Sequence, residues 1–281
     1  MSAPGTPILL LHGFWHGTWC WSEVLALLAA AGRPALAVDM AGHGLRALRP
    51  AAATGRPFDP AALATDPSPA ADITLDEAAA LLVSQAETLG GGAKVTAVAH
   101  SMGGTVLTRA VQDAPHLFAR AVYVCAFMPA SGVSAADCIV MPENEGDQAV
   151  ASMVADPAQI GALRIDPASP DPAYRQQLRT AFYADVDPAV ADAAIGLLTP
   201  DAPAGVPAGE TRLTADGWGS VRRAYIMCTQ DQALRPPLQR KFIADADAAF
   251  PGNPTEVHTL ESSHSPFLSM PGELAGILLK L

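Results

Sequence analysis

One serine near the middle of the chain stands in a sequence that could make it a nucleophile. Residues 99–104 read AHSMGG, and they follow an apolar run and precede a segment with helical character. A serine hydroxyl is nearly unreactive at neutral pH, so enzymes raise it on a tight strand-to-helix turn and give it a base. Ala99 replaces the first glycine of the usual GxSxG pattern, whereas Gly103 is kept. The alternative is that Ser101 only caps the helix that follows.

A serine nucleophile needs a base and a group that orients the base, and both residue types follow later apolar runs. Asp231 lies just after Arg223 to Cys228, and His264 lies just after Thr255 to Leu260. In an open parallel sheet, such strand ends collect at one edge. The sequence therefore predicts a triad of Ser101, Asp231 and His264. The separate alternatives are a surface-loop role for His264 and a helix N-cap role for Asp231.

The loop after the first apolar run could supply the remaining part of the site. Acyl transfer develops an oxyanion that backbone N–H groups must meet, and the expected donors are the residue after the nucleophile and one residue of this early loop. Met102 and Phe14 fit these positions. His12 and His16 also fit a supporting role in the loop, and Trp21 fits the core. The candidates for the substrate pocket are His12, Trp15, His100 and Phe127.

Apolar runs and helix-like segments alternate along most of the chain, as in proteins with a parallel sheet and helices on both of its faces. Continuous apolar runs such as Pro7 to His12 are typical of strands buried on both faces. The expected strands are 7–12, 35–39, 94–98, 120–127, 223–228 and 255–260. The expected helices are 19–31, 74–89, one that ends near 113, 237–250, and one that begins at 271.

Two segments break this alternation. Residues 45–71 have no periodicity and many prolines, so we expect an irregular surface excursion there. Residues 129–219 combine ten prolines with recurring Met, Leu, Phe and Tyr, which favours short helices packed as a cap. The predicted organisation is a first core segment at 1–128, a cap insertion at 129–219 and a second core segment at 220–281.

Composition limits the partners of this chain of 281 residues. With 28 acidic against 17 basic side chains, its net charge of −11 disfavours nucleic acid and anionic membrane surfaces. The four cysteines form no CxxC pair, and the N-terminus has no basic, apolar leader pattern, so we expect a cytoplasmic protein without disulfides. No metal-ligand spacing and no GxGxxG motif is present, so no metal and no cofactor is expected. The sequence leaves a homodimer as one possible oligomeric state.

Several motifs resemble one branch of the α/β-hydrolase superfamily, which contains plant methyl esterases, hydroxynitrile lyases and bacterial carboxylesterases. Residues 12–21, HGFWHGTWCW, are similar to the HGxxHGxWCW signature of that branch, as are AHSMGG, TQDQAL and SHSPFLSMP. The resemblance implies an α/β-hydrolase fold, a triad of Ser101, Asp231 and His264, and a mainly helical cap over the pocket. Lyases of the branch carry a lysine directly after the histidine; here that residue is Ser265, which disfavours cyanohydrin cleavage.

The expected function is that of a cofactor-independent carboxylesterase acting on a small to medium apolar ester. The excursion at 45–71 is longer than expected for plant members of the branch and could reshape the entrance to the pocket. This disfavours a plant hormone ester as the substrate. One alternative is a biosynthetic enzyme that uses the same site for lactonisation, cyclisation or carbon–carbon cleavage. Another is a receptor that binds a small molecule without turnover, because function is not fixed by the scaffold.

Overall fold

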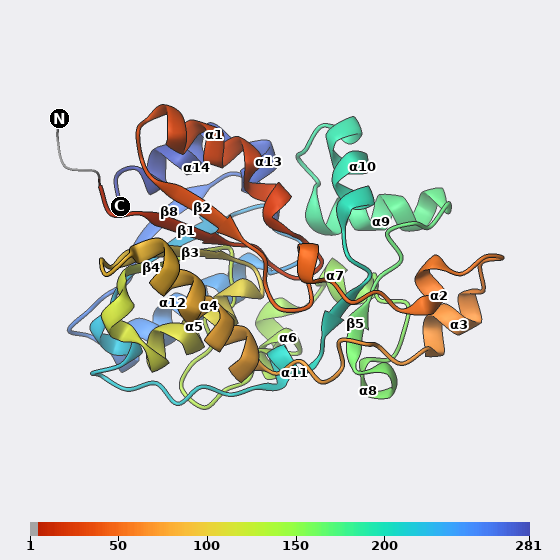
Figure 1. Cartoon of the computed structure of the whole chain (residues 1–281), viewed down its shortest axis with the longest axis horizontal. Coiled ribbons are helices and arrows are strands. Elements are labelled where there is room, and N and C mark those ends of the chain that lie inside the picture. The colour runs from red at the N-terminus through yellow and green to blue at the C-terminus, as the bar shows by residue number, and fades with distance from the viewer. Residues whose placement is uncertain (1–4) are drawn as a thin grey trace.

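The centre of the molecule is a six-stranded sheet in which every pair of neighbouring strands is parallel (Figure 1). The computed structural model describes residues 5–281, so the first four residues of the predicted core segment lie outside the described residues. The order in the sheet is β2-β1-β3-β4-β7-β8. The strands are β1 (Ile8–Leu11), β2 (Ala35–Val38), β3 (Val95–His100), β4 (Phe118–Val124), β7 (Arg222–Cys228) and β8 (Glu256–Leu260).

Helices cover both faces of this sheet, as predicted (Figure 1). Side chains alternate between the faces along a strand. In β1, Ile8 and Leu10 pack in one apolar cluster, whereas Leu9 and Leu11 pack in the other. The first cluster includes α1 (Ser22–Ala30) and α14 (Pro271–Leu278), and the second includes α4 (Leu75–Gly90), α5 (Gly103–Asp113) and α12 (Pro236–Ala249).

Most predicted elements are confirmed, with shifts at their ends. The capping box of Thr74 and Glu77 forms at the start of α4, where each residue's side chain accepts the other's backbone N–H. The helix expected from Trp19 is a 3₁₀ turn through Trp21 before α1 begins. Strand β4 ends at Val124, three residues before the predicted end, because the next residue turns the chain with a φ of +33°.

The proline-rich segments contain short helices that begin at their prolines. In four of them an aspartate immediately before the proline accepts N–H bonds from the first turn, which explains why these prolines start helices. Two short helices lie in the excursion, α2 (Ala51–Thr54) and α3 (Pro60–Thr65). The remaining helices are α6 (Ala135–Ile139), α7 (Gln148–Ala151), α8 (Pro157–Ile160), α9 (Pro172–Phe182), α10 (Pro188–Leu197), α11 (Gly205–Ala208) and α13 (Pro266–Ser269).

The region between β4 and β7 also holds an antiparallel strand pair that the sequence did not predict. Strands β5 (Ala162–Arg164) and β6 (Asp201–Pro203) place Arg164 opposite Asp201. The buried guanidinium donates to both carboxylate oxygens at 2.6 and 2.8 Å. It also donates to the carbonyl oxygens of Leu63 and Asp66 at 2.7 and 2.8 Å. The excursion is therefore fastened to the predicted cap segment, whose boundaries at 129 and 219 stay a prediction.

Replacing Arg164 with alanine is expected to lower the free energy of unfolding by about 3–5 kcal/mol, because Asp201 would remain as a buried and unpaired charge. Urea unfolding of the purified variant measures this loss. Arg179→Ala is the matched control, since its partner Asp192 lies on the surface and exposed pairs contribute about 0–1 kcal/mol. A loss below 1 kcal/mol in Arg164→Ala would contradict the prediction.

All four cysteines are buried free thiols in the structure. Among residues 5–281, no helix combines the length and apolar character needed to cross a membrane.

Candidate active site

Ser101 lies at the turn between β3 and α5, in the strand-to-helix position that the sequence predicted. Its backbone has a φ of +52°, a conformation that side chains other than glycine rarely adopt. Close contacts demand small neighbours at this turn: a Cβ atom on Gly13 would lie 2.5 Å from the Cβ of Ser101, and one on Gly104 would collide with the carbonyl oxygen of Phe127. The elbow therefore depends on glycines from two separate segments.

His264 and Asp231 come together at the carboxyl ends of β8 and β7. The Nδ1 atom of His264 lies 2.8 Å from Oδ2 of Asp231, and both side chains are buried. Asp231 also accepts the backbone N–H groups of Ala233 and Leu234 at 2.8 and 2.9 Å, and the side-chain amide of Gln239 at 3.3 Å. An imidazole that donates its Nδ1–H to a carboxylate keeps a lone pair on Nε2, which is the atom needed to accept a proton.

Ser101 and His264 line the same cavity. The predicted oxyanion residues, Phe14 and Met102, line it too. Within residues 5–281, the backbone N–H of neither residue donates to another protein group. The four residues thus line one cavity, and two of them have backbone N–H groups without a protein acceptor among the described residues.

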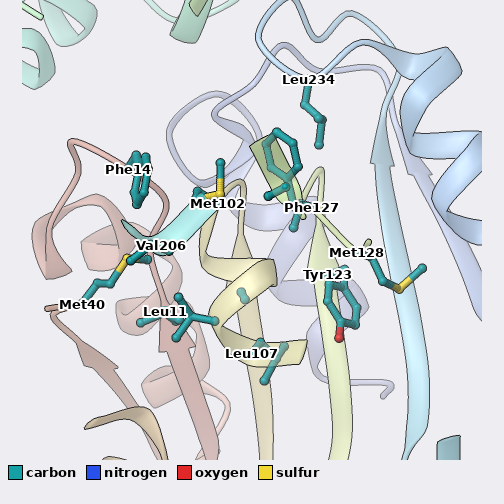
Figure 2. Close-up of a cluster of buried hydrophobic side chains, with 14 of the residues drawn as sticks. Leu11, Phe14, Met40, Met102, Leu107, Tyr123, Phe127, Met128, Val206 and Leu234 are labelled. Atoms are coloured by element: carbon teal, nitrogen blue, oxygen red, sulfur yellow. The ribbon is translucent and has the colours of Figure 1, made fainter. Parts of the chain in front are cut away.

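The walls of the cavity are apolar. Figure 2 shows Met102 between Phe14 and Phe127, with Leu107 and Tyr123 lower in the same packed cluster. Trp15 and Phe127, both predicted pocket residues, line the cavity. Other lining side chains come from the region between β4 and β7 and from the Asp231 loop: Ile139, Asp147, Ala149, Val150, Met153, Leu163, Phe182 and Ala233.

The other two predicted pocket residues, His12 and His100, are not among the residues that line the cavity. Both rings are fully buried, and both form hydrogen bonds with backbone groups. His12 donates from Nδ1 to the carbonyl oxygen of Gly13 and accepts the N–H of Met40 at Nε2. His100 contacts the carbonyl oxygen of His264 through Nε2 at 2.8 Å. These rings support the loops behind the cavity.

His16 also supports the loop that carries Phe14. Its Nδ1 atom donates to the carbonyl oxygen of Phe14 at 2.8 Å, and its Nε2 atom accepts the hydroxyl of Tyr183 at 2.9 Å. Trp15 is held from the same side, because its carbonyl oxygen accepts the N–H of Thr199 and its indole N–H donates to Leu163. Residues between β4 and β7 therefore fix this early loop.

Two polar residues at the site escaped the sequence analysis. Gln239, on α12, donates to Asp231, but nothing in a helical glutamine signals this contact. Asp147 lines the cavity, and burial raises the pKa of its carboxyl to about 6 despite hydrogen bonds from the N–H groups of Ala149 and Val150. No pattern in the sequence singles out Asp147.

One set of potential metal ligands lies beside the site. Ligand atoms of His100, Cys125 and His264 lie within 4.8 Å of one another. Burial raises the pKa of the Cys125 thiol well above its usual value, which opposes the thiolate that a metal ion requires. The Nδ1 atom of His264 is already paired with Asp231. These residues fit a metal ion poorly, and the absence of a metal stays our prediction.

Stability is expected to fall as the pH drops from about 6.5 toward 3. Burial lowers the pKa of His16 and of His43 to about 3, and it lowers the pKa of His100 well below its usual value of 6.5. In this window the unfolded chain binds protons that the folded chain does not, so folding weakens with acid. Asp147, whose pKa is raised to about 6, offsets part of the loss between pH 6 and 3.8. Urea unfolding at pH 7.5, 6 and 5 tests this, and equal stability at all three would contradict it.

Comparison with protein families gives a match over residues 8–277 to the model described as "Alpha/beta hydrolase family". Among curated proteins, "Methylesterase 9" of Arabidopsis thaliana is 27% identical, over 97% of this chain and 96% of its own length. "Esterase PIR7B" of Oryza sativa subsp. japonica is 30% identical, over 97% of this chain and 94% of its own length. These relatives confirm the resemblance to plant methyl esterases.

Solved structures agree with this fold. A structure described as the pyrethroid hydrolase PytH has a TM-score of 0.74 and 21% identity, covering 98% of this chain and 96% of that chain. A polyneuridine aldehyde esterase has the same TM-score and identity, with 98% of both chains covered. The sheet, the helices on its two faces and the family match over nearly the whole sequence show that this chain belongs to the alpha/beta hydrolase family.

Proposed function

We propose that this chain is a carboxylesterase that works through Ser101, His264 and Asp231. The observation that carries the proposal is a single cavity lined by Ser101, on its positive-φ turn, by His264, and by Phe14 and Met102, whose backbone N–H groups have no protein acceptor among the described residues. The hydrogen bond between His264 and Asp231 supports the role of base for the histidine. A hydroxyl, a base, an orienting carboxylate and an oxyanion site are the four parts that acyl transfer requires.

In the proposed reaction, Oγ of Ser101 attacks the ester carbonyl carbon while Nε2 of His264 takes its proton. The N–H groups of Phe14 and Met102 hold the oxygen that becomes negative. The bond to the alcohol oxygen then breaks, and His264 returns the proton to the leaving alcohol. Water, deprotonated by His264, attacks the acyl-enzyme, which releases the acid and restores Ser101. Asp231 stabilises the imidazolium in both halves of the reaction.

The cavity supports a small to medium apolar ester as the substrate. Its wall is built from aromatic, aliphatic and methionine side chains such as Phe14, Phe127 and Met153. Apolar walls favour the acyl and alcohol groups by burial, whereas few polar groups are present to recognise a highly polar substrate. The named activities of relatives, methylesterase and esterase, are compatible with this class.

The same proposal includes no cofactor, no metal and no macromolecular partner. A location in the cytoplasm fits four unpaired thiols, and a homodimer stays an untested alternative.

A p-nitrophenyl ester series of increasing acyl length tests the proposal. The purified protein is assayed with each ester and is then treated with a fluorophosphonate, and the modified peptide is located by mass spectrometry. Turnover of short and medium chains with an adduct on Ser101 is the expected result. An adduct on another residue, or neither turnover nor adduct, would overturn the proposal and favour a receptor. A cyclised product from a hydroxy ester would favour ring closure over hydrolysis.

A further inference from the structure

A carboxylate from the region between β4 and β7 binds the loop that carries His264. Asp185 lies between α9 and α10, and its Oδ2 atom accepts the backbone N–H of Ser263 at 3.0 Å. Its Oδ1 atom accepts a hydrogen bond from the hydroxyl of Ser263. Ser263 is buried, whereas Asp185 is exposed, so the contact reaches from the surface into the site. The residue held in this way is the immediate neighbour of His264.

The other contacts of this loop act on different atoms. The carbonyl oxygen of His264 lies 2.8 Å from Nε2 of His100 and 3.5 Å from the thiol of Cys125. His100 is the last residue of β3, and Cys125 directly follows β4. The imidazole is paired with Asp231. Asp185 holds the N-terminal side of His264, whereas core residues hold its C-terminal side. The backbone that sets the direction of the ring is thus fixed from two parts of the molecule.

We propose that Asp185 is a positioning residue, which orients His264 toward Ser101 by holding Ser263. This inference rests on the proposed esterase function. A carboxylate that accepts two hydrogen bonds is a strong and directional anchor, because bonds to ionised groups are stronger than neutral ones. Proton transfer depends steeply on geometry, so a small shift of the imidazole slows the reaction even when the substrate still binds. The position of the predicted cap, which carries Asp185, would thereby affect the rate at which His264 accepts the proton of Ser101.

The test compares Asp185→Asn with Asp192→Asn. Asparagine keeps the size of the side chain but places an NH2 donor against one of the two Ser263 donors. Asp192 is a carboxylate of the same region that pairs with Arg175 and Arg179 on the surface, so it matches the loss of charge without touching the His264 loop. The measurements are kcat and KM on a p-nitrophenyl ester, the rate of fluorophosphonate labelling at Ser101, and amide hydrogen exchange of the peptide 261–265.

For Asp185→Asn, kcat is expected to fall about 10- to 100-fold with KM within about twofold of wild type. Labelling of Ser101 should slow by the same factor, and exchange in 261–265 should become faster. Asp192→Asn should match wild type in all three. An unchanged kcat, or a raised KM with kcat kept, would overturn the proposal and leave Asp185 as an ordinary anchor.

Ser263→Ala provides a second variant, which removes the hydroxyl and keeps the N–H. Because both changes act on one contact, the double variant should lose no more activity than Asp185→Asn alone. Additive losses would overturn the proposal. If the wild type neither turns over esters nor labels at Ser101, the proposed function fails, but amide hydrogen exchange of the peptide 261–265 still tests the inference. Unchanged exchange in Asp185→Asn would overturn it. Faster exchange would support the role of Asp185 in holding the loop.

Discussion

Ser101→Ala is expected to lower kcat by at least about 10³-fold and by as much as about 10⁶-fold, as removal of a triad serine does in general. Alanine removes the attacking oxygen, and neither His264 nor the free N–H groups can replace it as a nucleophile. The serine is partly exposed in the cavity, and its side chain makes none of the hydrogen bonds that hold the turn, so the fold should persist. Steady-state assays and circular dichroism measure the two halves of this prediction.

Ser84→Ala is the control for this variant. Ser84 lies on the exposed side of α4, where alanine is a good helix former, so this change should keep wild-type turnover. A Ser101→Ala enzyme that retained more than about a tenth of the wild-type rate would contradict the assignment of the nucleophile. Loss of the fluorophosphonate adduct in Ser101→Ala, together with its presence in Ser84→Ala, would locate the reactive hydroxyl independently of any substrate.

The sheet was predictable because its inner strands are short, mainly apolar runs in which most residues are buried. Strand β1 is entirely buried, and so is β3, which ends at the residue before Ser101. Parallel strands bring their carboxyl ends to one edge, so their order along the chain sufficed to group Ser101, Asp231 and His264. These three predicted positions depended on strand ends rather than on details of packing.

The region between β4 and β7 was less predictable because its contacts join distant residues through short elements. The bond between Asp185 and Ser263 spans 78 positions, and that between Arg164 and Leu63 spans 101. No periodic pattern marks either contact. The sequence analysis interpreted the prolines as interruptions of secondary structure. In the structure, several helices begin at a proline that follows an aspartate.

His12 and His100 show a different limit of sequence analysis. Both lie at the carboxyl ends of buried strands, as residues of a pocket wall often do, but a histidine with two ring nitrogens can also form hydrogen bonds with backbone groups behind that wall. The sequence predicts where a strand ends, but it does not predict the direction in which a histidine ring at that end points. In the structure the rings turn toward Met40 and toward the carbonyl oxygen of His264, so they brace the loops instead.

Asp231→Asn is expected to lower kcat by about 10⁴-fold while the protein stays folded. Asp231 is completely buried and has four donors around it: two backbone N–H groups, the amide of Gln239 and Nδ1 of His264. An asparagine can offer its oxygen to the backbone N–H groups, but its NH2 group then faces His264. The imidazole must present a lone pair at Nδ1 to accept from that NH2, which moves the proton to Nε2 and removes the base that Ser101 needs.

The measurement for Asp231→Asn is kcat on the best p-nitrophenyl ester, with the rate of fluorophosphonate labelling beside it. Labelling should still reach Ser101, far more slowly than in the wild type, because the nucleophile is present and only its base is in the wrong tautomer. Asp245→Asn is the control, since this carboxylate only pairs with Lys241 one turn earlier on α12. A kcat within tenfold of wild type would show that Asp231 does not orient the base. Complete absence of labelling in a folded Asp231→Asn protein would instead mean that the carboxylate holds the shape of the whole site, because a wrong tautomer alone leaves the hydroxyl of Ser101 in place.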